Sequence, residues 1–263
     1  MKADYKNWVP KGMAYGLTAA AGVLSVGAAA AELIADEDSP IFVKALPYIL
    51  GAGALGCAAF GGWSWYARGQ FSYEGNRKLS KQIIEGTAEY INLPEGGTCL
   101  DVGCGSGALT IACAKRSPAA SIIGIDRWGA EYASFSKKLC YENAAAEGVD
   151  NVSFRQGDAC KLDFPDETFD AVTSNYVYHN ITGKNKQGLL KETLRVLKKG
   201  GTFAIHDIMS PQRYGDMGAF IRQLKEEGYE TAELIPTDSG KFMTSFEAGV
   251  LMLKGSSLLV GRK

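Results

Sequence analysis

The stretch Leu100-Asp101-Val102-Gly103-Cys104-Gly105-Ser106-Gly107 decides the fold of most of this 263-residue chain. It overlaps an apolar run, residues 98–102, which predicts a buried parallel strand. Three glycines then alternate with small residues, and a helical pattern follows from Ala108 to about Lys115. Strand, glycine turn and helix together predict a site for a nucleotide-like ligand. The free amides and positive dipole end of a helix N-terminus attract negative charge, and glycine admits the ligand close to the backbone.

Two classes of ligand use such a turn. Gly103-x-Gly105-x-x-Ala108 loosely matches the dinucleotide fingerprint G-x-G-x-x-G/A. The acidic Asp101 and the tight G-x-G-x-G spacing instead resemble the first motif of the class I methyltransferases that use S-adenosylmethionine. This resemblance implies an α/β, Rossmann-like methyltransferase fold, with a mostly parallel seven-stranded sheet and an antiparallel last strand. A chance glycine turn is the remaining alternative.

The composition argues against nucleic-acid-binding and metal-binding proteins. The net charge is −1, so no global field favours nucleic acid. The six cysteines form no C-x-x-C pair and no metal-like cluster with the two histidines. We therefore expect free thiols in a reducing compartment and no metal site.

Two uncharged runs precede residue 70. Residues 12–31 and 45–67 are about 20 and about 23 residues long, enough for each to cross a hydrocarbon core as a helix. The acidic turn Asp36-Glu37-Asp38-Ser39-Pro40 separates them. This pattern predicts a transmembrane hairpin with helices at about 12–34 and 42–67. It divides the chain into a membrane anchor, residues 1–70, and a methyltransferase domain, residues 71–263.

Basic residues give the hairpin an orientation. They flank the two runs at their outer ends and are missing from the connecting turn before Lys44. The positive-inside rule then places the catalytic domain and both termini in the cytoplasm, with a multi-pass anchor in the plasma (inner) membrane. Small residues at four-residue spacing also suit helix packing and homo-oligomer formation. A soluble helical cap over the active site and a cleaved signal peptide are the alternatives.

Acidic residues follow the next two predicted strands. Asp126 ends the strand 121–126 and lies about 19 residues beyond Gly107, the spacing at which a carboxylate reaches ribose hydroxyls. A helix N-cap is its alternative role. Gly157-Asp158-Ala159 follows the strand 152–156, and the resemblance implies that Asp158 and the Ala159 amide bind adenine. The predicted cofactor-binding residues are Asp101, Gly103, Cys104, Gly105, Ser106, Gly107, Asp126, Arg127, Asp158, Ala159 and Asn175.

The fourth predicted strand, 169–174, runs into the polar and aromatic stretch 175–180. Loops at the carboxyl ends of parallel strands line the ligand crevice. The resemblance implies that Asn175 contacts the cofactor amine and that the stretch faces the methyl acceptor. His179 is the first candidate for a general base and His206 the second, because imidazole titrates near neutrality. Tyr176 or Tyr178 could orient the acceptor or line the sulfonium; His179 could alternatively be a packing residue.

The rest of the chain predicts further elements. A helical pattern covers residues 131–147, and another ends at Gly200-Gly201. Residues 231–236 and 256–260 resemble the antiparallel final strands of the methyltransferase sheet. The apolar segment 242–253 between them predicts either a core-covering helix or a surface for the bilayer or an apolar acceptor.

These observations favour methyl transfer from S-adenosylmethionine to a small acceptor. The resemblance is closest to small-molecule methyltransferases of the quinone-biosynthesis-like group, and the hairpin suggests an amphiphilic or membrane-associated acceptor. The candidate catalytic residues are His179 and Tyr178. A non-catalytic, cofactor-binding membrane scaffold and a protein methyltransferase are the alternatives.

Overall fold

The computed structural model describes residues 2–129 and 134–263. They form two compact units: Asn7–Ser80, and Lys81–Lys263 together with the residues up to Lys6. Each unit is described by itself.

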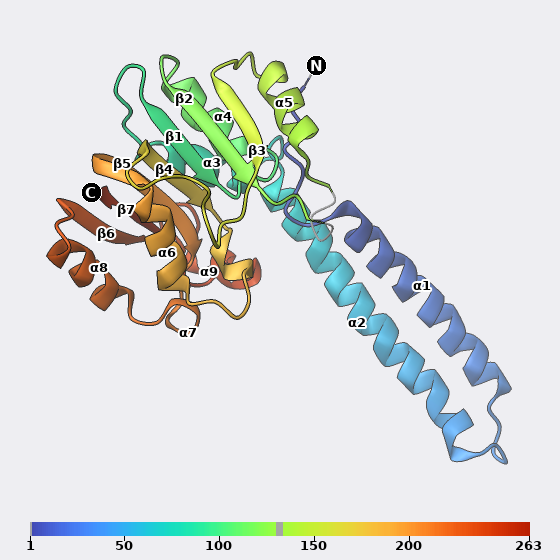
Figure 1. The fold of residues 1–263 in the computed structure, drawn as a ribbon. Helices are drawn as coiled ribbons and strands as arrows, with labels where there is room; N and C mark the ends of the chain where they lie inside the picture. The colour runs from blue at the N-terminus through green and yellow to red at the C-terminus, as the bar shows by residue number, and fades with distance from the viewer. Residues whose placement is uncertain (1, 130–133) are drawn as a thin grey trace. The chain divides into compact units, whose positions relative to one another are not determined.

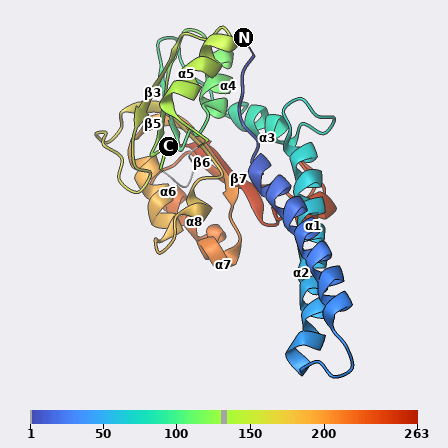
Figure 2. The same ribbon diagram turned by 90° about the vertical axis from the view of Figure 1, so that its right-hand side faces the viewer.

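The unit Asn7–Ser80 is built on two antiparallel helices, α1 (Lys11–Ile34) and α2 (Ile41–Phe71), which lie side by side (Figures 1 and 2). Both are long and apolar enough to cross a membrane by length and composition. Glycines let them approach closely: a Cβ on Gly61 would lie 3.4 Å from Thr18 Oγ1. The predicted bounds agree with these helices, except that α2 continues to Phe71.

The larger unit contains one mixed sheet. Within the described residues it has seven strands in the order β3-β2-β1-β4-β5-β7-β6. Strands β1 to β5 run parallel to one another, and β7 is inserted between β5 and β6 and pairs antiparallel with both. The strands are β1 (Thr98–Val102), β2 (Ser121–Asp126), β3 (Val152–Gln156), β4 (Phe169–Asn175), β5 (Leu197–Ile208), β6 (Thr231–Pro236) and β7 (Ser256–Arg262). The predicted Rossmann-like methyltransferase fold, with its reversed last strand, is confirmed.

Helices cover this sheet (Figure 1). Helices α4 and α5 pack on the β1–β3 half, and α6 and α8 contact β5 and β6 respectively. The largest buried side chains, among them Phe154, Phe169 and Phe203, fill the core between these layers. The helices are α3 (Leu79–Ala88), α4 (Ala108–Arg116), α5 (Lys137–Ala146), α6 (Lys186–Arg195), α7 (Pro211–Tyr214), α8 (Met217–Glu226) and α9 (Ser245–Val250).

Two predicted helix boundaries are wrong. Helix α5 begins at Lys137 because the Ser136 hydroxyl accepts from the Leu139 amide as an N-cap, whereas the pattern suggested residue 131; residues 131–133 lie outside the described residues. Helix α6 ends at Arg195, and β5 already begins at Leu197. Gly200 has φ +77° and lies at an irregularity of the β4–β5 pairing, so the glycine pair shapes a strand rather than ending a helix.

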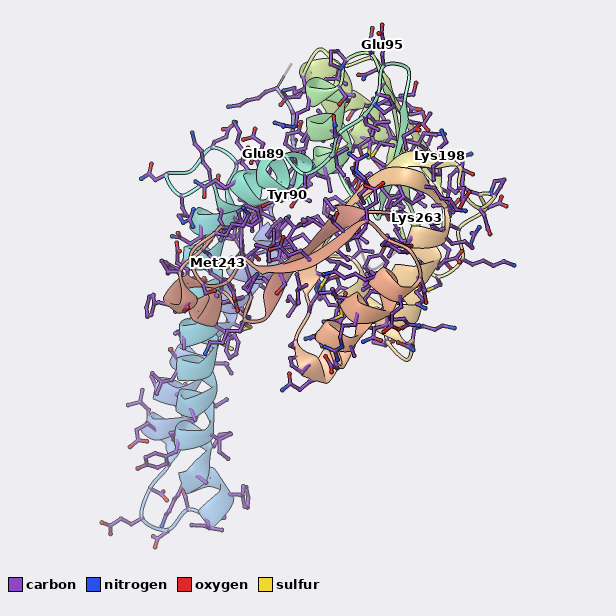
Figure 3. The ribbon with its side chains drawn as sticks, turned by 90° about the vertical axis from the view of Figure 1, so that its left-hand side faces the viewer. Glu89, Tyr90, Glu95, Lys198, Met243 and Lys263 are labelled. Atoms are coloured by element: carbon purple, nitrogen blue, oxygen red, sulfur yellow. The ribbon has the colours of Figure 1, made fainter. Side chains whose placement is uncertain are left out.

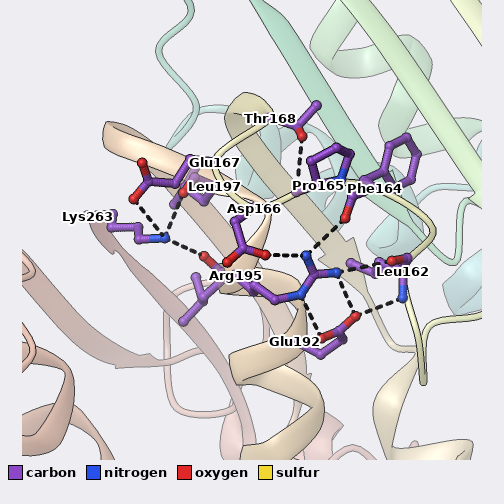
Figure 4. Close-up of polar contacts among 11 residues, drawn as sticks. Leu162, Phe164, Pro165, Asp166, Glu167, Thr168, Glu192, Arg195, Leu197 and Lys263 are labelled. Carbon is purple, nitrogen blue, oxygen red and sulfur yellow. Dashed lines mark hydrogen bonds and ion pairs between the residues drawn. The ribbon is translucent and has the colours of Figure 1, made fainter.

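A polar network holds the loop before β4 in place (Figure 4). The Arg195 guanidinium donates to the carbonyls of Leu162 and Phe164 and pairs with Glu192 and Asp166. The pKa of Glu192 is lowered, chiefly because its carboxylate accepts from Arg195. The end of α6 thus fixes the segment that leads into β4.

The apolar segment after β6 is partly buried. Met243, labelled in Figure 3, and Leu251 are buried, so the segment covers the core. Phe246 and Met252 remain 74% and 60% exposed. A capping box between Thr244 and Glu247 starts α9.

Candidate cofactor and acceptor site

The predicted site residues gather at one edge of the sheet. Because β3, β2, β1, β4 and β5 are adjacent and parallel, their carboxyl ends share this edge. The strand order reverses beside β1, with β2 on one side and β4 on the other. Open α/β sheets bind ligands at such a switch point.

The three glycines of the loop after β1 differ in what a side chain would contact. Gly103, Gly105 and Gly107 all have positive φ, at +75°, +55° and +82°. A Cβ on Gly103 would lie 2.3 Å from a Val177 methyl, and one on Gly107 would lie 3.0 Å from the Phe154 ring. A Cβ on Gly105 would meet nothing closer than 3.9 Å. Gly103 and Gly107 therefore serve packing, whereas Gly105 leaves room for a ligand.

Backbone contacts hold the loop tightly. The amides of Gly103 and Cys104 donate to the Ile125 carbonyl at 2.8 and 2.9 Å, and the Gly107 amide donates to the Cys104 carbonyl at 2.7 Å. The Cys104 side chain is buried in a small apolar cluster with Cys140 and Phe154. Cys104 therefore supports the loop from inside.

Asp101 lies beneath the loop and is only 1% exposed. Its carboxylate accepts from the Thr110 hydroxyl of α4 at 2.6 Å and from the Thr173 hydroxyl of β4 at 3.1 Å. Burial raises the pKa of Asp101 to about 6, although both hydroxyls oppose that rise. This placement supports the loop and does not present the carboxylate for the cofactor contact that the resemblance implied.

Asp126 occupies the end of β2 and remains partly exposed. One carboxylate oxygen accepts from the Gly105 amide at 2.9 Å and the other from the Trp128 amide at 2.8 Å. The Trp128 indole donates to the Gly105 carbonyl at 3.0 Å. Since each carboxylate oxygen can accept more than one bond, Asp126 retains capacity for ribose hydroxyls.

A hollow lies beside Asp126, at the ends of β2 and β3. Arg127, Gly129, Gln156, Gly157 and Asp158 line it. Asp158 is exposed, and one of its oxygens accepts from the Cys160 amide at 2.8 Å. The hollow brings the predicted cofactor-binding residues Arg127 and Asp158 together.

On the other side of β1, the segment after β4 carries two histidines in different environments. His206 on β5 is fully buried; its Nδ1 lies 2.9 Å from Asn175 Oδ1 and its Nε2 lies 2.8 Å from Thr237 Oγ1. Burial lowers the pKa of His206 to about 3. A neutral imidazole with both nitrogens bonded inside the core is not placed to serve as a base, so the second-choice assignment is wrong.

His179 is held by a buried carboxylate. Its Nδ1 lies 2.6 Å from Asp207 Oδ1, and Asp207 is completely buried. Asp207 also accepts from the backbone amides of Tyr178, His179 and Ile208. Because a carboxylate only accepts, Nδ1 carries the proton and Nε2 keeps its lone pair. The His179 side chain is 16% exposed, so it remains accessible.

The structure separates the two neighbouring tyrosines, which were predicted as alternatives for orienting the acceptor or lining the sulfonium. Tyr178 is fully buried and its hydroxyl lies 2.5 Å from Thr193 Oγ1, so its side chain belongs to the core and cannot orient an acceptor. The reason is the 3₁₀ turn Tyr178–Asn180, which directs Tyr178 inward. Tyr176 instead lies between the histidines, with ring centroids 5.8 Å from His179 and 4.6 Å from His206. Its φ of +53° is unusual for a tyrosine and marks a constrained backbone at this edge.

The profile of a family described as a methyltransferase domain matches residues 93–249. The chain belongs to this family. The matched range contains the glycine loop, Asp126, Asp158 and the His179–Asp207 pair, so the predicted resemblance to S-adenosylmethionine-dependent methyltransferases is confirmed.

Relatives with named activities share the same part of the chain. Demethylmenaquinone methyltransferase of Bacillus licheniformis is 34% identical over 140 residues, which is 52% of this chain and 56% of that protein. Erythromycin 3''-O-methyltransferase of Saccharopolyspora erythraea is 29% identical over 189 residues, 61% of this chain and 58% of that protein. The methyltransferase described here therefore spans a little over half the length of these relatives.

Solved structures share the fold. The [4+2]-cyclase SpnF has a TM-score of 0.54 at 20% identity and covers 71% of this chain and 82% of its own. Geranyl diphosphate methyltransferase, in complex with GPP and sinefungin, has a TM-score of 0.51 at 15% identity and covers 72% and 79%. Since one of these is named as a cyclase, the fold alone does not specify the reaction.

Sequence reasoning missed three residues of this methyltransferase that the structure places around the site. The sequence indicated only that Asp207 follows His206 at the end of a strand. Asn143 and Tyr5 lie far from the glycine loop in sequence, and no local pattern connects them to it. The signal for Asp207 was available, because an acid after β5 must lie beside the segment after β4.

Proposed function

We propose that this protein transfers a methyl group from S-adenosylmethionine to a small, amphiphilic acceptor at the cytoplasmic face of the plasma (inner) membrane. The observation that carries the proposal is the glycine loop with its open Gly105 beside the partly exposed Asp126 carboxylate. A ligand close to the backbone and a carboxylate for vicinal hydroxyls are what a nucleoside cofactor requires. The residues present therefore fit S-adenosylmethionine.

Each side chain then has a role. Asp126 accepts from the ribose hydroxyls, Asp158 and the Ala159 amide bind adenine, and Asn175 binds the amino-acid end of the cofactor. When bound, S-adenosylmethionine supplies an electrophilic methyl group on a positively charged sulfur. His179 takes the proton of the acceptor through Nε2, and general-base help of this kind contributes about 10²- to 10⁴-fold. Asp207 positions His179.

The helices α1 and α2 support the membrane part of the proposal. Large apolar side chains on them are exposed, for example Val23 at 72%, Leu33 at 88% and Ile41 at 81%. Exposed apolar surface of this extent needs an apolar environment. A hairpin in the bilayer confines enzyme and acceptor to one surface and raises their effective concentration. The name of the demethylmenaquinone relative adds a quinone-type acceptor to those worth testing.

Calorimetry on the full-length protein tests the cofactor part. We expect S-adenosylmethionine to bind and NAD not to bind. Asp126→Ala should weaken S-adenosylmethionine binding about 10- to 100-fold, because hydrogen bonds to a charged group contribute about 1.5–3 kcal/mol. Asp150→Ala, which removes an exposed carboxylate before β3, is the control and should bind normally. NAD binding, or an unaffected Asp126→Ala, would reject the assignment.

Turnover in vesicles tests the acceptor part. The full-length protein is reconstituted with acceptors that share a head group and differ in a short or a long alkyl tail, and S-adenosylhomocysteine is measured. We expect faster turnover of the bilayer-embedded acceptors. Equal turnover of soluble and embedded acceptors would remove the reason for a membrane-associated substrate. Cofactor binding without turnover of any acceptor would favour the scaffold alternative.

A further inference from the structure

The segment that precedes α1 is bound to the glycine loop. Three residues, Asp4, Tyr5 and Lys6, form this segment, which we call the strap. They belong to the same compact unit as the sheet, although the helices α1 and α2 follow them in sequence. An element that precedes the hairpin in the chain is therefore part of the methyltransferase unit.

A single buried amide makes the connection. Asn143 of α5 is 1% exposed; its Oδ1 accepts from the Asp4 amide at 2.7 Å, and its Nδ2 donates to the Asp4 carbonyl at 3.1 Å. The same Nδ2 donates to the Ser106 carbonyl at 3.0 Å. Asn143 thus bonds both backbone groups of Asp4 and one backbone group of the glycine loop.

The loop also contacts the strap directly. The Ser106 hydroxyl donates to the Tyr5 carbonyl at 3.0 Å, and Ser106 is only 6% exposed. The Tyr5 ring packs against the apolar cluster beneath the loop that contains Cys104 and Cys140. Burial is the main reason that the pKa of Tyr5 is raised.

The strap has its own local geometry. The Asp4 carboxylate pairs with Lys6 Nζ at 2.6 Å and accepts from the Lys6 amide at 3.0 Å, and Lys6 has φ +59°. This turn directs the chain away from the loop after only three residues.

We propose that the strap is a positioning element of the cofactor site, held to the glycine loop by Asn143. Ser106 stands between Gly105, which leaves room for the ligand, and Gly107, which starts α4. Docking of the strap therefore fixes the loop in the shape that receives the cofactor, and by linkage the cofactor stabilises the docked strap. This inference rests on the proposed function, because it assumes that the loop binds S-adenosylmethionine.

The strap lies close in sequence to the first helix of the anchor. Only residues 7–10 separate the strap from the first residue of α1. The strap and α1 are thus joined by a short covalent connection.

Two variant pairs test the proposal in the full-length protein, with the binding of S-adenosylhomocysteine measured by calorimetry. Asp4→Pro removes the amide that donates to Asn143. Asp4→Ala keeps that amide and loses only the side-chain contacts with Lys6, which Asp4→Pro loses as well. We expect binding by Asp4→Pro to be at least 10-fold weaker than binding by Asp4→Ala.

The second pair compares two asparagines whose side-chain amides each make several hydrogen bonds to the backbone. Asn143→Ala breaks the strap connection, whereas Asn151→Ala breaks the bonds from Asn151 Nδ2 to the carbonyls of Ser117 and Ala120, away from the loop. We expect Asn143→Ala to weaken binding at least 10-fold and Asn151→Ala to change thermal stability without changing binding. Combining Asp4→Pro with Asn143→Ala should add little to either single change, because both break one connection.

Hydrogen exchange supplies a reading independent of affinity. S-adenosylhomocysteine should slow exchange in the peptide that contains Asp4 and Tyr5, and should lose that effect in Asn143→Ala. Two results would overturn the proposal and leave the proposed function intact. One is wild-type affinity for S-adenosylhomocysteine in folded Asp4→Pro and Asn143→Ala. The other is a hydrogen-exchange rate at the strap that does not change when the ligand binds. A wild-type protein that does not bind the ligand would instead overturn the proposed function together with this inference.

Discussion

At the scale of single residues, the proposed catalysis depends on the pair His179 and Asp207. The 2.6 Å contact and the complete burial of Asp207 fix the imidazole with its Nδ1 proton toward the carboxylate. Asp207→Asn removes the charge that favours this tautomer. Turnover of the best acceptor should fall about 10²- to 10⁴-fold, with S-adenosylmethionine binding unchanged, because Asp207 acts through His179.

Imidazole nitrogen NMR checks the same prediction without an acceptor. The chain has two histidines, so a His206→Asn variant assigns both rings. We expect a single Nδ1-protonated tautomer for His179 in the wild type and a mixture in Asp207→Asn. Identical tautomers in both proteins would contradict the positioning role.

Asp101 gives a pH dependence with a definite sign. Its folded-state pKa of about 6 lies above the ordinary value near 3.9, so the folded protein binds this proton more tightly than the unfolded chain. The contribution of Asp101 to stability is therefore greatest below about pH 4 and falls as pH rises to about 6, by about 3 kcal/mol. Asp101→Asn should become more stable relative to the wild type across this window. Thermal unfolding of both proteins at pH 4 to 7 measures the difference; a pH-independent difference would contradict it.

At the scale of elements, different glycines of the glycine loop are expected to affect folding and ligand binding. Gly103→Ala places a Cβ 2.3 Å from Val177 at a positive φ, so we expect loss of the folded protein or a large fall in its thermal stability. In Gly105→Ala the new methyl group would meet only the Phe135 ring at 3.9 Å and costs about 1 kcal/mol for the left-handed backbone, yet it occupies the room left for the ligand. Gly105→Ala should fold and bind S-adenosylmethionine poorly. Normal binding by Gly105→Ala would show that the ligand does not approach this face.

Local sequence predicted the elements that carry strong local signals. The bounds of β1, β2, β3 and β6 agree with the predicted ranges 98–102, 121–126, 152–156 and 231–236. The end of α6 was misjudged because Gly200-Gly201 looks the same in sequence whether it ends a helix or bends a strand. Tyr178 and Tyr176 could not be separated because a 3₁₀ turn reverses which side chain points inward. The strap depends on pairs such as Asp4 and Asn143, which no local pattern relates.

At the scale of the whole molecule, the two units have different surfaces. In the larger unit most large apolar side chains are buried, whereas α1 and α2 expose theirs along much of their length. Each surface suits one solvent: water for the sheet unit and an apolar medium for the hairpin. The acidic turn between α1 and α2, with Asp36 and Glu37, is too polar to lie within a bilayer and must reach water on one side of it.

Thiol labelling in spheroplasts tests the topology that follows from this division. A Ser39→Cys variant places a thiol in the turn between α1 and α2, and Cys160 supplies a native, partly exposed thiol in the sheet unit. If the hairpin spans the membrane with both ends inside, a membrane-impermeant maleimide should label the new thiol in intact spheroplasts and reach Cys160 only after permeabilisation. The protein should also stay in the membrane fraction after a carbonate wash, because two apolar helices anchor it independently of surface charge. Labelling of Cys160 but not of the new thiol without permeabilisation would show the reverse orientation. Labelling of both thiols, or release by carbonate, would contradict a hairpin that spans the membrane.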